Sequence, residues 1–278
     1  MKNIYGRRWS CATPGLLILL LDQSESMLQP YDDRGSRLEV STYMANRAIG
    51  SLIQRCFDGV RAKNRCFISI IGYNRNVTEL CSGWLSVFDA DPLRVEIVKK
   101  TVPDGAGGTV EVEVQQPLWV DPVRSGGDAN MFGAFSYAKE LVQEWISRFP
   151  ENPVPVIINI SDGAPYYDGK DPRECMKETA GLAKEIMSLS TEDGNVLIYN
   201  VQVGGNLKNA DMFPNDRNKL EQEETKFLFD ISSEVPESCL TDLHHIYGDD
   251  LIGEQLSRRG ARGLTNELKY IPTYFPLD

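Results

Sequence analysis

Residues 16–27, LLILLLDQSESM, join six consecutive aliphatic residues to a group of oxygen-bearing side chains, and this junction decides the fold. A short continuous aliphatic run is typical of a strand that is buried on both faces of a parallel sheet. Asp22 therefore stands where a buried strand ends and a loop begins, which is where ligands bind in open α/β sheets. Asp22, Ser24 and Ser26 provide one carboxylate and two hydroxyls, and such hard oxygen donors suit a divalent cation such as Mg²⁺.

The composition is that of an ordinary soluble globular protein. Of the 278 residues, 41% are hydrophobic and 25% are charged, which excludes disordered and fibrous classes. The net charge of −11 repels polyphosphate backbones, so we expect no nucleic-acid partner. The apolar run at 16–21 is far shorter than the roughly 20 residues of a membrane span, and it stops at Asp22 without a signal-peptide cleavage site. We expect no membrane partner.

The cysteine and histidine content favours a reducing compartment and disfavours zinc. The six cysteines include no Cys-x-x-Cys pair, which is typical of reduced core cysteines in a cytoplasmic protein. His244 and His245 are the only two histidines, and side chains at adjacent positions point in different directions. We therefore expect a cytoplasmic protein without a histidine-based metal site.

Strands and helices are predicted to alternate along most of the chain. Apolar runs predict buried strands, and apolar residues at helical spacing predict amphipathic helices. The expected strands cover 16–21, 66–71, 154–160 and 195–203, and the expected helices cover 37–57, 131–149 and 172–189. This alternation predicts an α/β fold with a Rossmann-like, open, mostly parallel sheet and helices on both faces.

The segment 74–127 departs from this alternation. It is rich in glycine and proline and contains the alternating sequence VEVEV at 110–114, which predicts short antiparallel strands on a half-exposed surface. We interpret it as an insertion within a single domain that covers 1–278, with a core at 14–205 and a C-terminal extension at 206–278. Within that extension, 225–233 and 238–245 are candidates for short helices.

A second acidic residue follows another buried strand. The strand expected at 154–160 ends in Ser161-Asp162-Gly163, just as the first strand ends in Asp22. Parallel strands bring their carboxyl ends to one edge of the sheet. We therefore expect Asp22 and Asp162 to lie at the same edge.

The two junctions together resemble the von Willebrand factor type A (VWA) domain. Its metal-ion-dependent adhesion site begins with Asp-x-Ser-x-Ser after the first strand, which Asp22, Ser24 and Ser26 match, and INISDG at 158–163 is similar to its Ile-Thr-Asp-Gly element. The resemblance implies a non-enzymatic protein-interaction module. It also implies a site for Mg²⁺ or Mn²⁺ that uses Asp22, Ser24 and Ser26, with Asp162 acting through water.

The resemblance extends to bacterial stand-alone VWA proteins associated with tellurium resistance or encoded beside protein kinases and phosphatases. The similar segments are IIGY at 70–73, DGNVLIYN at 193–200 and SSEVP at 232–236. This kinship implies an adaptor or regulatory scaffold in a bacterial stress, defence or signalling system. The implied partner is another protein, such as a kinase or phosphatase of the same system.

The sequence departs from the family pattern at two places. Glu25 stands where the family usually has glycine, and SGGDANM at 125–131 occupies the place of a threonine ligand, so that Asp128 or Ala129 replaces the threonine. Thr109 is a second candidate for that ligand. If Asp128 joins Asp22 and Asp162, the site carries three negative charges and attracts an anionic ligand less; if Ala129 holds the position, a water must replace the missing ligand.

These residues also allow other interpretations. Asp and Ser after a strand can simply cap a helix or satisfy turn amides, and Asp128 can cap the helix that starts near Met131. A strand that ends in aspartate also resembles haloacid-dehalogenase-type phosphatases, but their general acid lies two residues later, where this chain has Ser24. Because the chain also lacks a Gly-x-Ser-x-Gly motif and a P-loop, we expect no enzymatic activity.

The last alternative is a metal-independent scaffold that binds through the segment 110–120. Leu118, Trp119 and Val120 would form either an exposed anchor for a partner or a buried cluster.

Overall fold

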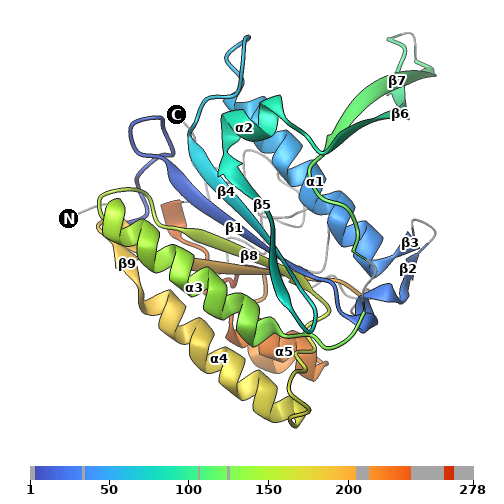
Figure 1. Cartoon of the computed structure of the whole chain (residues 1–278). Coiled ribbons are helices and arrows are strands. Elements are labelled where there is room, and N and C mark those ends of the chain that lie inside the picture. Colours follow the sequence, from blue (N-terminus) through green and yellow to red (C-terminus); the bar gives the residue numbers. More distant parts are fainter. Residues whose placement is uncertain are drawn as a thin grey trace.

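A computed structural model describes residues 4–32, 35–105, 107–123, 126–204, 213–238 and 260–265. Its centre is a six-stranded sheet with the strand order β12-β11-β8-β1-β4-β5 (Figure 1). The strands are β1 (Gly15–Asp22), β4 (Cys66–Tyr73), β5 (Val77–Trp84), β8 (Val156–Ser161), β11 (Leu197–Gln202) and β12 (Leu264–Thr265). All neighbouring pairs are parallel except β4 and β5. The predicted α/β class with a mostly parallel sheet is confirmed.

Helices cover both faces of this sheet (Figure 1). They are α1 (Arg37–Cys56), α2 (Leu85–Ala90), α3 (Met131–Arg148), α4 (Pro172–Ser188) and α5 (Glu223–Asp230). The seven strands and helices expected from apolar patterns are all present, and their ends differ from the expected ones by at most two residues.

The strand β1 is buried along its whole length because its side chains alternate between two hydrophobic layers. Leu17, Leu19 and Leu21 pack in the layer that contains α1 and α2. Leu16, Ile18 and Leu20 pack in the layer that contains α3, α4 and α5. The aliphatic run of 16–21 is therefore explained by a central strand that contacts helices on both sides.

The segment 74–127 contains less inserted structure than expected. Its first part forms β5, an antiparallel edge strand of the main sheet, and α2 follows directly. The inserted part is a two-stranded hairpin of β6 (Arg94–Pro103) and β7 (Thr109–Leu118), which projects from the body of the molecule (Figure 1).

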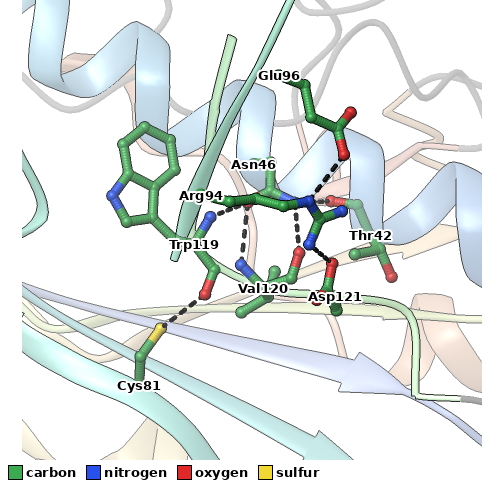
Figure 2. A network of polar contacts seen from close by, with 8 residues as sticks. All are labelled: Thr42, Asn46, Cys81, Arg94, Glu96, Trp119, Val120 and Asp121. Atoms are coloured by element: carbon green, nitrogen blue, oxygen red, sulfur yellow. Dashed lines mark hydrogen bonds and ion pairs between the residues drawn. The ribbon is translucent and has the colours of Figure 1, made fainter. Parts of the chain in front are cut away.

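The base of this hairpin is fastened to α1. Leu118, Trp119 and Val120 are buried, so the exposed-anchor alternative for these three residues is wrong. The side chain of Asn46 on α1 accepts hydrogen bonds from the backbone amides of Trp119 and Val120 and donates one to the Val120 carbonyl (Figure 2). Close by, Arg94 pairs with Glu96 and Asp121.

The smaller elements are short ladders and single turns. They are the 3-10 helices η1 (Glu25–Leu28) and η2 (Arg217–Lys219), the pair β2 (Pro30–Asp32) and β3 (Gly35–Ser36), and the pair β9 (Ser190–Thr191) and β10 (Gly194–Asn195). The helix expected at 225–233 corresponds to α5. The one expected at 238–245 falls, apart from Ser238, outside the described residues, as do His244 and His245. Among the described helices, none combines the length and the apolar character that crossing a membrane requires.

Candidate metal centre

The central feature of the site is Asp22, the last residue of β1. Its side chain is completely buried, and its Oδ1 atom accepts a hydrogen bond of 2.9 Å from the backbone amide of Ser24. Its Oδ2 atom is also buried but has no hydrogen-bond partner. Buried carboxylate oxygens almost always have partners, because leaving them unpaired is unfavourable. The Oδ2 atom is therefore free to accept a cation or a hydrogen-bond donor.

Asp162 lies beside Asp22 at the same edge of the sheet, as expected. The strands β1 and β8 are parallel neighbours in which Leu21 pairs with Ile160, so Asp22 lies one residue and Asp162 two residues beyond this pair. Burial raises the pKa of Asp22 to about 7, and the negative charge of Asp162 contributes in the same direction. The polar groups of Ser24 and Tyr73 close to this carboxylate lower its pKa but are outweighed.

The two serines add neutral oxygens next to Asp22. Ser24 is buried and Ser26 is half-buried, and their Oγ atoms lie 3.1 Å apart within hydrogen-bonding distance. Met27 is completely buried and anchors η1 in the core. Glu25 is exposed, and its backbone amide donates to the carbonyl of Gly127, so the family's glycine position accepts a side chain that points to solvent.

The loop that carries Asp162 has a backbone that only glycine fits. Asp162 Oδ1 accepts a hydrogen bond of 3.2 Å from Ala164, and Gly163 follows with a positive φ of 88°. A Cβ atom at Gly163 would lie 2.9 Å from Leu228 and 3.1 Å from the carbonyl oxygen of Glu224. This close approach of α5 explains the glycine of the Ser-Asp-Gly element.

The replacements for the family's threonine ligand have other partners. Asp128 pairs with Arg75 at 3.5 Å, and Ala129 is buried and forms a backbone bridge with Tyr166. The N-cap of α3 is Asn130, not Asp128. Thr109 lies in β7 opposite Pro103, next to the turn of the projecting hairpin and far along the ladder from its base.

The oxygen donors at this edge are compatible with a hydrated magnesium ion. Asp22, Ser24, Ser26 and Asp162 supply two carboxylates and two hydroxyls, and Mg²⁺ is usually held by one or two carboxylates while it keeps several waters. Within the described ranges, no group of three or more His, Cys, Asp or Glu residues could hold a metal ion, so an all-protein cage of acids is absent there. The unpartnered Oδ2 of Asp22 supports this fit.

Sequence reasoning missed one charged residue at this edge. Arg37, the first residue of α1, places Nη1 3.4 Å from Oδ2 of Asp162. No motif indicates an arginine at this position, because the contact joins residues that are 125 positions apart in the chain.

No family model matches this chain, and no curated protein matches it. Similar solved structures include the conserved hypothetical protein BatB from Bacteroides thetaiotaomicron, with 16% identity over 68% of this chain and 66% of that chain and a TM-score of 0.36. They also include the ArnB paralog VWA2 from Sulfolobus acidocaldarius, with 17% identity over 68% of this chain and 35% of that chain and a TM-score of 0.36.

A third similar structure is the vWF domain of the type V pili tip protein Mfa5 from Porphyromonas gingivalis. It has 15% identity over 55% of this chain and 39% of that chain, with a TM-score of 0.31. The chain thus spans less than two thirds of the length of each of these three structures.

Proposed function

We propose that this chain is a VWA-like protein-interaction module that binds a partner through a divalent metal ion. Asp22, Ser24 and Ser26 would hold Mg²⁺ or Mn²⁺, with Asp162 acting through water, and the ion would supply a coordination position for an acidic side chain of the partner. The observation that carries the proposal is the buried, unpartnered Oδ2 atom of Asp22.

The charge balance of the site is compatible with an acidic ligand. With a cation bound, Asp22 and Asp162 would carry two negative charges, and the hydroxyls of Ser24 and Ser26 are neutral. Asp128 pairs with Arg75, so its charge is offset by a nearby guanidinium. A divalent ion with Asp22 as the direct carboxylate ligand would therefore keep enough positive charge to attract a carboxylate.

The residues at this edge favour binding over catalysis. Ser24 occupies the position of the general acid in haloacid-dehalogenase-type phosphatases, and a serine hydroxyl is a poor proton donor at neutral pH. We therefore propose a non-enzymatic role. Motif resemblance further supports a cytoplasmic adaptor or scaffold in a bacterial stress, defence or signalling system, with a kinase or phosphatase of that system as partner.

Calorimetric titration with Mg²⁺ and Mn²⁺ tests the proposal directly. We expect binding by the wild-type protein and loss of binding in Asp22→Asn, which keeps the shape of the side chain but removes its charge. Asp128→Asn is the matched control and should bind as the wild type does. No heat with either ion, or equal binding by Asp22→Asn, would reject the metal site.

A second candidate function is a metal-independent scaffold that uses the projecting hairpin. The observation that favours it is the exposure of apolar side chains on the β6–β7 hairpin, away from the candidate metal site. Ile97 is 69% exposed and Val95 is 50% exposed. Affinity capture from the source cell separates the two candidates. Capture that survives a chelator but is lost in Ile97→Asp would assign binding to the hairpin, whereas chelator-sensitive capture would assign it to the metal.

A further inference from the structure

Arg37 is held in a defined place beside the acidic edge. The preceding residue, Ser36, forms a capping box with Glu39: Ser36 Oγ accepts from the Glu39 amide at 3.2 Å, and Glu39 Oε2 accepts from the Ser36 amide at 2.9 Å. The backbone amide of Arg37 also donates to the carbonyl of Gln29 at 3.0 Å. These contacts fix the start of α1, so only the side chain of Arg37 has freedom to move.

The guanidinium of Arg37 lies between the ends of two strands. Its Nη1 atom contacts Asp162, which follows β8, and its Nε and Cζ atoms lie close to Gly204, which follows β11. A Cβ atom at Gly204 would lie 2.3 Å from Nε and 2.5 Å from Cζ of Arg37, so glycine is what allows the guanidinium to enter. The side chain of Arg37 is 23% exposed and that of Asp162 is 9% exposed.

Hydrogen bonding among the charged side chains at this edge is incomplete. The Nε atom of Arg37 is buried and lacks a hydrogen-bond partner, and so does the Oδ2 atom of Asp22. Arg37 therefore offsets the charge of Asp162 but leaves one buried donor and one buried acceptor unused. Because unpaired buried polar atoms are unfavourable, this arrangement is less stable than a fully paired one.

We propose that Arg37 is a built-in competitor of the divalent cation. In the metal-free protein the Arg37 guanidinium provides the positive charge beside Asp162. An ion held by Asp22, with Asp162 acting through water, would compete with this guanidinium for the Asp162 carboxylate, because two neighbouring cations repel each other. The inference rests on the proposed metal site. It adds that Arg37 lowers the metal affinity, and that metal binding moves the Arg37 side chain while α1 stays in place.

Titration of Mn²⁺ into the wild type, Arg37→Gln and Arg75→Gln tests the competition. Arg75 is the matched control because it pairs with an acid of the same edge, Asp128, but not with Asp162. We expect Arg37→Gln to bind Mn²⁺ about tenfold more tightly than the wild type. Arg75→Gln should stay within about twofold of the wild type.

The outcomes separate the inference from the proposed function. Equal Mn²⁺ affinity in the wild type and Arg37→Gln would overturn the competition and leave the metal site in place. The absence of binding in all three proteins would overturn both.

A measurement on the wild type avoids any dependence on variant folding. The Nε–Hε resonance of Arg37, assigned by its loss in Arg37→Gln, should shift when Mg²⁺ is added, because the guanidinium leaves Asp162. Calorimetric Mg²⁺ binding with an unchanged Arg37 resonance would also overturn the inference.

Discussion

The side-chain amide of Asn159 donates a hydrogen bond of 2.9 Å to the side-chain oxygen of Asn200, and this contact joins two central strands, β8 and β11. The Tyr73 hydroxyl donates to Asn159 at 2.9 Å, and the Asn200 amide donates to Ser232 at 2.9 Å. All four side chains are buried. Because Tyr73 pairs with Asp22 across β4 and β1, this polar row supports the edge that carries the candidate site.

Asn159→Ala should destabilise the protein by about 3 kcal/mol. The substitution leaves the Tyr73 hydroxyl and the Asn200 oxygen buried without their present partners, and each such loss costs about 1–3 kcal/mol. Urea unfolding measures the change. Asn76→Ala, at an exposed position in the loop after β4, is the control and should change the stability by less than about 0.5 kcal/mol. Equal unfolding midpoints for both variants would contradict the structural role of the row.

The acidic pair was predictable from the sequence, but the polar row was not. Asp22 and Asp162 follow apolar runs that form parallel neighbouring strands, so pattern and topology place them together. Asn159 and Asn200 lie inside such runs, where apolar periodicity does not reveal which polar residue pairs across strands. Their partners become apparent only from the register of β8 against β11.

The other features that the sequence did not predict also arise from contacts between distant segments of the chain. The strand β12 contains two residues, Leu264 and Thr265, and exists because it pairs with β11 more than 60 positions earlier in the chain. No local pattern predicts so short a strand. The contact between Arg37 and Asp162 could not be predicted either. Helical spacing places Arg37 at the start of α1 but does not indicate which residue its side chain contacts.

Asn46→Ala should loosen the projecting hairpin. The substitution removes the acceptor of the Trp119 and Val120 amides, which are buried at the hairpin base. We expect a loss of about 2–3 kcal/mol and faster hydrogen exchange at these two amides. Gln54→Ala, on the exposed side of α1, is the control. Unchanged exchange at Trp119 and Val120 in Asn46→Ala would show that the hairpin is anchored by other contacts.

Gly163→Ala should disturb the loop of Asp162 more than backbone strain alone can explain. Gly169 is the matched control because its φ of 64° is also positive, but a Cβ atom there would meet nothing within 4 Å. We expect Gly169→Ala to cost about 1 kcal/mol, and Gly163→Ala to cost about 2 kcal/mol more because its methyl group clashes with Leu228 on α5. Thermal unfolding of the two variants gives the difference. Equal losses would indicate that α5 does not constrain this loop.

The stability of the metal-free protein should fall as the pH rises from about 4 to about 7. Burial and the charge of Asp162 raise the pKa of Asp22 from 3.8 to about 7, so the folded state binds more protons than the unfolded state between these values. Stability is therefore greatest at the acidic end of this window, decreases through it, and levels off above the folded-state pKa.

Urea unfolding at several pH values in the presence of a chelator measures this dependence. In Asp22→Asn most of the decrease should disappear, and a smaller decrease should remain because the pKa of Asp193 is also raised by burial. In the wild type, saturating Mg²⁺ should suppress the decrease, because an ion beside Asp22 favours its charged form. A stability that rises between pH 4 and pH 7 in the metal-free wild type would contradict a buried Asp22 with an unpartnered Oδ2 atom and remove the main support for the metal site.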